Sequence, residues 1–138
     1  MPRSTVSKLL VVAVALGFWA CANNSTTTSP TSPTTTTTET FEGTLNPNGA
    51  KTFPFTVLTA GTVTATLTTV SPDASVAIGL ALGTWNGAAC QIVLANDSAT
   101  QGAVVTGSAS AAGNLCTRVY DVGNLTDVTS FVVTVVHP

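Results

Sequence analysis

The sequence predicts an all-β protein: an antiparallel, jelly-roll-like β-sandwich of about eight strands that follows a signal peptide and a disordered linker. Three observations carry this prediction. Short runs rich in Val, Thr, Ile, Leu and Phe recur from residue 41 onward, and Gly, Asn, Asp and Pro separate them. No stretch has the period of about 3.6 residues that marks an amphipathic helix. Strand-like runs at spacings of about 8–12 residues are typical of sandwiches.

The run 61–70, GTVTATLTTV, is the clearest strand. Val63, Ala65 and Leu67 occupy alternate positions, and threonines fill the positions between them. A period of two with β-branched residues on both faces is typical of an antiparallel strand that is buried on one side. We therefore expect the apolar face of this run to point into the core.

The run 52–58, TFPFTVL, is expected at the edge of a sheet, because Pro54 has no backbone N–H to donate to a neighbouring strand. The run 75–83, SVAIGLALG, alternates larger aliphatic residues with Ala and Gly, and its neighbours favour a strand over a short helix. The remaining strand candidates are 40–45, 89–95, 103–109, 115–122 and 130–136.

Residues 1–21 have the layout of an export signal. Two basic residues without an acid precede the run 9–19, LLVVAVALGFW, which is eleven apolar residues long. A membrane-spanning helix needs about 20 apolar residues, whereas about 7–15 suffice for the apolar part of a signal peptide. The segment therefore predicts export, with cleavage close to Cys21.

Two kinds of processing fit the end of this segment. FWAC resembles the lipobox of bacterial lipoproteins, in which a small residue precedes a cysteine that receives diacylglycerol. Ala20 and Cys21 match that pattern, while Phe18 and Trp19 are bulkier than the residues usual there. Ala20–Cys21–Ala22 also fits the A-x-A site of ordinary signal peptidase, which would remove the cysteine. Lipidation of Cys21 is the interpretation that the following tract favours.

Residues 22–40 form a Thr/Ser/Pro-rich linker. From residue 23 the tract has no hydrophobic side chain, so it cannot bury enough surface to fold. In polyproline-like geometry, at about 3.1 Å per residue, it reaches up to roughly 55 Å. A tether of this kind lifts a domain clear of a membrane, which favours a lipid-anchored protein. The folded domain is expected at 41–138.

The charge balance argues against two classes of partner. Beyond the signal segment only Lys51 and Arg118 are basic, against six acidic residues, which leaves a formal charge of −4. Nucleic-acid binding needs a cluster of Lys and Arg, and docking on anionic lipid headgroups needs one too. We expect no nucleic-acid partner, and contact with a membrane only through a lipid anchor.

Cys90 and Cys116 remain once Cys21 is lipidated or removed. Two cysteines in an exported chain form a disulfide by default, and both lie in strand candidates. A metal site is the alternative, but neither cysteine belongs to a C-x-x-C pair and no histidine lies nearby in the sequence. We expect a structural disulfide between them and no metal.

We expect no catalytic residues, no enzyme activity and no cofactor. His137, the single histidine, is the second-last residue, where a frayed chain end is expected rather than part of a catalytic triad. The Asp residues stand in turn-like contexts, which favours a role in shaping turns. Asp121 and Asp127 flank one loop, and with backbone carbonyls they could bind calcium weakly.

Trp85 and Asn86, in LGTWNGAAC, are the candidate ligand contacts. A Trp exposed on a loop beside Asn and Gly can stack on a sugar ring. A Trp that caps the core at one end of the sandwich is the other interpretation.

A resemblance to a known family rests on three stretches: FEGTLNPNGAKTFPFTV, AGTVTATL and AAGNLCTRVYDVGNLTDVTSFVVTVVHP. They are similar to the bacterial pre-peptidase C-terminal domain family, whose members read G-x-L…G…x-F-x-F-x-V, then AG-x-V-x-V-x-L, then AG-x-Y-x-V-R-V. The resemblance covers about residues 41–138. It implies a jelly-roll-like sandwich that serves as an extracellular accessory module, often attached to secreted peptidases.

Together these observations predict a non-enzymatic bacterial lipoprotein. Its sandwich would be displayed at the cell envelope, on the periplasmic side or the outer surface of a membrane, with an envelope protein or a glycan as partner. The alternative is a secreted carbohydrate- or protein-binding module that uses the loop around Trp85.

Overall fold

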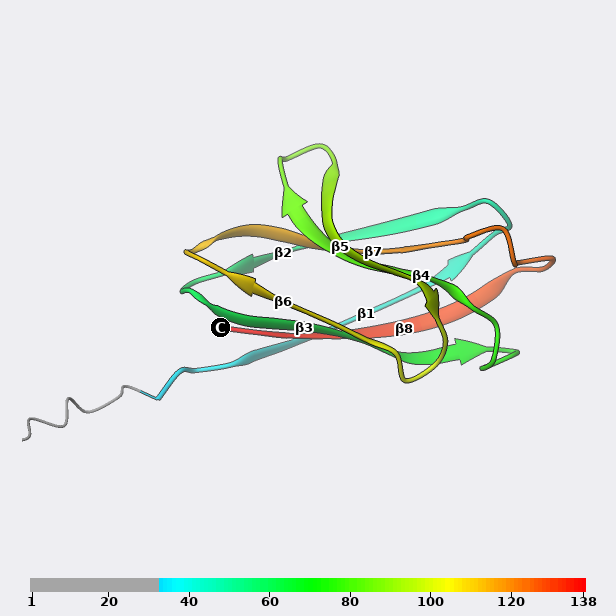
Figure 1. Ribbon diagram of the computed structural model, residues 1–138, viewed down its shortest axis with the longest axis horizontal. Coiled ribbons are helices and arrows are strands. Elements are labelled where there is room, and N and C mark those ends of the chain that lie inside the picture. Colours follow the sequence, from blue (N-terminus) through cyan, green and yellow to red (C-terminus); the bar gives the residue numbers. More distant parts are fainter. Residues whose placement is uncertain (1–32) are drawn as a thin grey trace, which may run out of the picture. The chain divides into compact units, whose positions relative to one another are not determined.

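The computed structural model describes residues 33–138, which contain eight strands and no helix, and therefore no helix that could cross a membrane. The strands form two four-stranded antiparallel sheets that pack face to face, so the predicted all-β sandwich is confirmed (Figure 1). The predicted signal peptide, Cys21 and most of the predicted linker lie outside the described residues. The strands are β1 (Thr37–Leu45), β2 (Ala50–Val57), β3 (Gly61–Ser71), β4 (Ile78–Trp85), β5 (Cys90–Ala99), β6 (Val104–Ala109), β7 (Gly113–Tyr120) and β8 (Thr129–His137).

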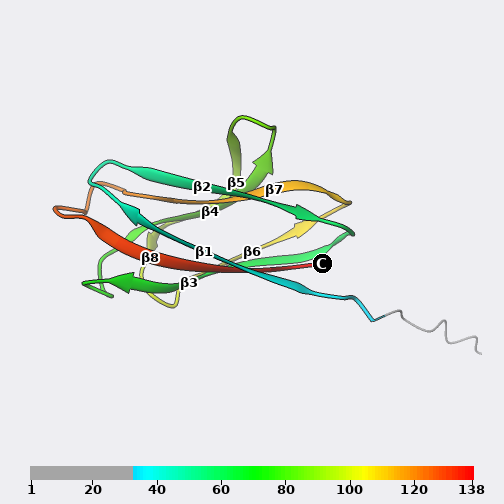
Figure 2. The ribbon, with the colours of Figure 1, turned by 180° about the vertical axis from the view of Figure 1, so that it is seen from behind.

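Sheet A contains β1, β8, β3 and β6 in that order, and sheet B contains β2, β7, β4 and β5. Figure 2 shows the same two layers from behind. β1 pairs with β8, β2 with β7, β3 with β6 and β4 with β5, each pair antiparallel. In this nested pairing the first strand meets the last and the two middle strands meet each other, which is the topology of an eight-stranded jelly roll.

The core lies between the sheets and takes alternate residues from strands such as β3 and β8, whereas β5 contributes only Ala99. In β3, Val63, Ala65 and Leu67 are buried, while the threonines between them stay partly or fully exposed, as the alternation predicts. Phe131 in β8 is the largest fully buried side chain. Burial of such side chains, at about 25 cal/mol per Å² of apolar surface, is the main force that holds the two sheets together.

The prediction for Pro54 is also confirmed. Its strand, β2, is the outermost strand of sheet B and pairs with β7 alone. The side of β2 that faces away from β7 needs no backbone donor, so the missing N–H of proline is tolerated there.

The folded region begins earlier than the predicted boundary at residue 41. β1 starts at Thr37, and its first four residues pair with residues 134–137 of β8. A search for hydrophobic runs misses these residues. An edge strand can be largely exposed to solvent and still be held by backbone hydrogen bonds to its neighbour. Threonine, moreover, favours strands through its branched Cβ. The predicted linker of 22–40 therefore loses its last four residues to the sandwich.

His137 does not fray, contrary to the expectation from its place in the sequence. It is the last residue of β8, and only 2% of its surface is exposed. Its Nε2 lies 3.0 Å from Oε1 of Glu39 on β1, and its ring packs on Phe55 with the ring centroids 5.1 Å apart. The chain end is held because β8 is an inner strand, paired on one side with β1 and on the other with β3.

Candidate functional site

The β4–β5 hairpin carries both predicted contact residues. Trp85 ends β4 and Cys90 begins β5. In the turn between them, Oδ1 of Asn86 accepts hydrogen bonds from the backbone N–H groups of Ala88, at 2.9 Å, and Ala89, at 2.8 Å. Gly87 adopts a φ of 95°, which side-chain-bearing residues rarely do. Asn86 therefore shapes the turn with the same oxygen that a ligand would need.

The predicted disulfide is present and fixes this hairpin. Cys90 on β5 is bonded to Cys116 on β7, with the two Cα atoms 5.8 Å apart. β4 lies between β5 and β7 in the strand order of sheet B, so the bond joins two strands that do not pair with each other. Trp85 stands opposite Cys90 and Pro54 stands opposite Cys116 in the strand registers, so the disulfide lies close to the indole.

A second link joins the same two strands near their other ends. The hydroxyl of Tyr120 on β7 donates a hydrogen bond to Oδ1 of Asp97 on β5. The Tyr120 ring lies over Gly79 of β4, where any side chain would collide with it. Burial raises the pKa of Tyr120 to about 12, and the hydrogen bond and negative charge of Asp97 add to the effect.

Small residues on β4 allow the Tyr120 ring and the backbone of β5 to pack closely against this strand. Gly79 lies under Tyr120, Ala81 is fully buried, and a Cβ on Gly83 would collide with the backbone of Gln91. The alternation of Ala and Gly seen in the sequence therefore marks a strand that is covered on both faces.

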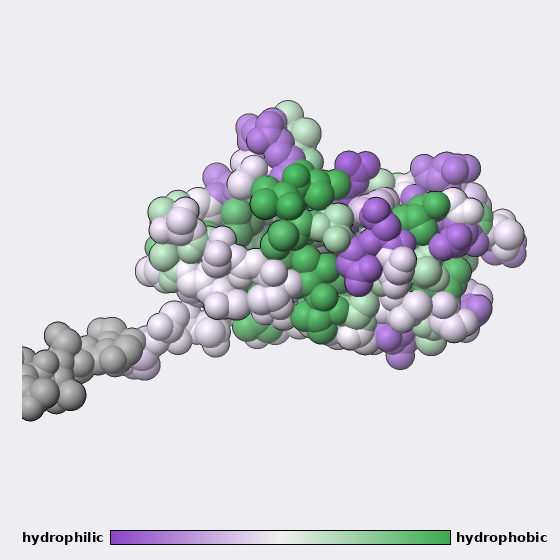
Figure 3. Space-filling view, viewed as in Figure 1, coloured by the Kyte–Doolittle hydropathy of each residue, from purple (hydrophilic) through white to green (hydrophobic). Residues whose placement is uncertain are grey.

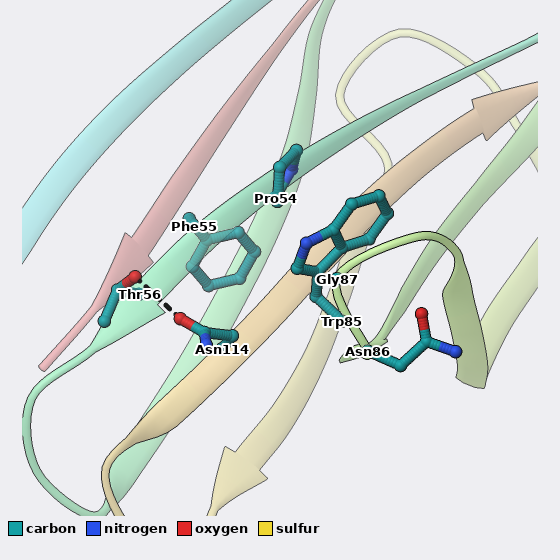
Figure 4. Close-up of a pocket in the computed structure, with 7 residues that line it drawn as sticks. All are labelled: Pro54, Phe55, Thr56, Trp85, Asn86, Gly87 and Asn114. Atoms are coloured by element: carbon teal, nitrogen blue, oxygen red, sulfur yellow. Dashed lines mark hydrogen bonds between the residues drawn. The ribbon is translucent and has the colours of Figure 1, made fainter.

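A groove opens between the hairpin and the neighbouring strands (Figure 4). It has a volume of about 520 Å³. In Figure 4 the indole of Trp85 faces the β2 and β7 side of the groove, whereas the Asn86 side chain extends away from it. Trp85 is half-buried and is not among the residues of the core cluster. The groove is lined by Pro54, Phe55, Thr56, Trp85, Asn86, Gly87 and Asn114.

The groove combines an apolar wall with a polar one. Trp85 and Pro54 supply the apolar surface. On the other wall, Oγ1 of Thr56 donates to Oδ1 of Asn114 at 3.0 Å, which fixes the orientation of that amide. Among the described residues the amide nitrogen of Asn114 donates no hydrogen bond, so it is free to meet a ligand. No lining residue is charged, which suits a neutral ligand.

Pro54, Thr56 and Asn114 were not predicted as site residues. They are far from Trp85 in the sequence and reach the groove only through the register of β2 against β7, which sets Thr56 opposite Asn114. No local sequence pattern indicates that register.

Asp121 holds two loops together. Oδ2 accepts the N–H of Asn48, and Oδ1 accepts the N–H groups of Gly123, Asn124 and Leu125, at 2.8 to 3.2 Å. Burial acts to raise the pKa of Asp121, but these backbone donors outweigh it and hold the pKa below its ordinary value. The predicted turn role is confirmed for this residue.

The calcium hypothesis meets little support in this loop. Both oxygens of Asp121 are taken by backbone donors, and Oδ2 of Asp127 accepts the hydroxyl of Thr126 at 3.2 Å. Within residues 33–138, no group of three or more His, Cys, Asp or Glu side chains is placed to hold a metal ion.

No family model matches this sequence, and no curated protein matches it. The resemblance to the pre-peptidase C-terminal domain family therefore remains an expectation from the quoted motifs. The jelly-roll topology is compatible with it.

Proposed function

We propose that the protein is a bacterial lipoprotein that is exported, anchored through Cys21, and displays its sandwich as a non-enzymatic interaction domain at the cell envelope. The observation that carries this proposal is the order of three segments. A basic and apolar run ends at Cys21, a tract without hydrophobic side chains follows, and a compact unit begins at Pro33. This is the order of signal, tether and displayed domain.

Two features of the folded unit support export. The Cys90–Cys116 disulfide is the kind of bond that persists outside the reducing cytosol. The jelly-roll fold is also the one that the pre-peptidase C-terminal resemblance implies for an extracellular accessory module. With β1 starting at Thr37, a linker of 22–36 would reach up to about 45 Å if extended.

Metabolic labelling with an alkyne analogue of palmitate tests the anchor. We expect label on the wild-type chain and on Asn24→Ser, which changes the tract but leaves Cys21 in place. We expect no label on Cys21→Ser, which should leave the membrane fraction. Label on Cys21→Ser would contradict anchoring through Cys21. Wild-type protein that is exported without label would contradict the lipoprotein assignment and favour a secreted protein.

The Trp85 groove favours a second candidate function, the binding of a neutral glycan. A half-buried indole opposite a free amide donor is an arrangement that stacks on a sugar ring and hydrogen-bonds its hydroxyl groups. The rigid hairpin supports this role, because the disulfide holds the indole in place before a ligand arrives.

Tryptophan fluorescence can test glycan binding directly, since Trp19 and Trp85 are the two tryptophans of the chain. In a Trp19→Phe background, a panel of neutral oligosaccharides should shift the emission of Trp85 saturably. Loss of one amide hydrogen bond, of about 1 kcal/mol, predicts about fivefold weaker binding for Asn114→Ala. A spectrum that no glycan changes, or unaltered glycan retention by Trp85→Ala on an affinity column, would sink this candidate.

A further inference from the structure

Four strands form the open edges of the sandwich. β1 and β6 end sheet A, while β2 and β5 end sheet B. β1 lies beside β2, and β5 lies beside β6, so the molecule has two open sides. An open edge offers unpaired backbone groups to any other chain, and natural proteins commonly protect such edges with charges or proline.

The β1–β2 side has that protection. β1 carries Glu39 and Glu42, and β2 carries Lys51 and Pro54. Charged side chains and proline both oppose the approach of another apolar strand. This side is therefore suited to remain in water.

The β5–β6 side lacks this protection and is apolar instead. β6 has no charged residue and no proline, and the single charge of β5, on Asp97, is engaged by Tyr120. Figure 3 shows hydrophobic residues in a continuous stripe across the face on which β5 and β6 lie. Val93 is 68% exposed and Val104 is 51% exposed. We call this surface the β5–β6 patch, formed by Ile92, Val93, Leu94 and Val104.

A groove lies within the patch, between the two edge strands. It has a volume of about 170 Å³, and its wall includes Val93 itself. Buried residues of both sheets, Val63 and Leu82, line it, so it leads toward the core. Gly107 keeps it open on the β6 side, because a Cβ there would lie 2.8 Å from a methyl group of Leu94. The patch thus offers a protruding valine and, next to it, an apolar recess.

We propose that the β5–β6 patch is an interface at which two copies of this chain associate about a twofold axis. In such a contact each copy presents the same surface. The protruding side chain of each copy can therefore fit the recess of the other copy, so the same contact is made twice. Each Val93 would enter the groove of the other copy. Because the patch is uncharged, two copies can meet there without bringing like charges together. The acidic residues that give the formal charge of −4 beyond the signal segment lie outside the patch, and Asp97 of β5 accepts the hydrogen bond of Tyr120.

The stretch between Cys21 and the start of β1 is not suited to cover the patch. Between Cys21 and the start of β1, the sequence has Ala22 and then only Asn, Ser, Thr and Pro. Such a tract gains little by leaving water for an apolar groove. The observations therefore favour a second copy over an internal strap.

Cysteine cross-linking of the full chain in exporting cells tests the interface. A cysteine at position 93 lies near the twofold axis, so Val93→Cys should form a covalent dimer under mild oxidation. Val128→Cys is the matched control, because Val128 is 54% exposed and lies outside the patch, between β7 and β8. A dimer from Val93→Cys alone, with a 93–93 link by peptide mass, supports the proposal. Monomeric Val93→Cys, equal dimer from both variants, or a link to another protein overturns it.

A charge placed in the patch gives an independent measurement. Val93→Lys should raise the dimer dissociation constant at least tenfold in sedimentation velocity, because the contact would bury an unpaired ammonium group. Val128→Lys should leave it unchanged. Both side chains are exposed, so neither variant should unfold the monomer, and the intact Cys90–Cys116 bond reports folding. Wild-type protein that stays monomeric, or Val93→Lys protein that dimerises like wild type, contradicts the proposal.

Discussion

The β1–β2 side and the β5–β6 side of the sandwich are both built from edge strands, but they are held in different ways. β1 pairs with β8 along its full length without interruption, and Glu39 meets the buried His137. The ladder between β5 and β4 shifts at two places, and residues 91–95 are exposed on both faces. Two side-chain links to β7, the disulfide and the Tyr120–Asp97 hydrogen bond, hold β5 in addition to its irregular ladder with β4.

This difference suggests how a jelly roll can present an apolar edge. In β1, which is held by a continuous ladder, the large hydrophobic residues Phe41 and Leu45 are partly or fully buried. A strand that is cross-linked over its neighbour can keep Ile92, Val93 and Leu94 outside. β4 permits this because its outward positions are occupied by Gly and Ala.

Removal of the disulfide is expected to have the largest effect on the unfolding free energy. Its local effect should be confined mainly to the β5–β6 side. Cys90→Ser/Cys116→Ser opens a loop with a sequence separation of 26 residues, which on the chain-entropy model costs about 3.5 kcal/mol of unfolding free energy. Urea titration followed by circular dichroism measures the loss. Hydrogen exchange should rise in β5 well before it rises in β1.

The control for this experiment is Cys21→Ser, which changes a cysteine that takes no part in this disulfide and should leave the urea midpoint unchanged. A double variant that loses less than about 1 kcal/mol, or that exchanges evenly along β1 and β5, would refute the idea that the disulfide holds β5 beyond what its ladder with β4 provides.

Removal of the buried imidazole tests the other side. His137→Ala deletes a well-packed ring and leaves Glu39 without its partner, which should cost about 2 kcal/mol of unfolding free energy. Glu39→Gln keeps an oxygen acceptor for the ring and should cost less than about 1 kcal/mol. Loss of under 0.5 kcal/mol in His137→Ala, on the order of a neutral surface change, would mean that the chain end contributes little to the β1 side.

The features that could be predicted are those encoded within one strand or by a small choice of partners. The alternation of Val63, Ala65 and Leu67 specifies which face is buried whatever strand lies beside it. Pro54 excludes its strand from a central position in a sheet, because proline has no backbone N–H to donate. The partners of the disulfide could be predicted because only two cysteines follow the signal segment.

The features that could not be predicted depend on register between distant strands. His137 is buried because β8 pairs on both sides, although its place near the chain end suggested fraying. Asn114 joins the Trp85 groove because it stands opposite Thr56. Pairing of strands that are far apart in sequence leaves no local pattern from which these neighbours could be found.

The smallest expected effect belongs to the second link on β5, and alkaline pH isolates it. Because the pKa of Tyr120 is raised from 10.0 to about 12, mainly by burial and further by Asp97, the folded state disfavours the phenolate. Its contribution to stability is complete below pH 10 and is lost as the pH rises toward 12. Tyr120→Phe should cost no more than about 1 kcal/mol at neutral pH, since its partner Asp97 is exposed to solvent. It should also flatten the fall in unfolding free energy between pH 10 and 12. An unchanged slope in Tyr120→Phe would assign that fall to other groups and leave the disulfide as the single established link on β5.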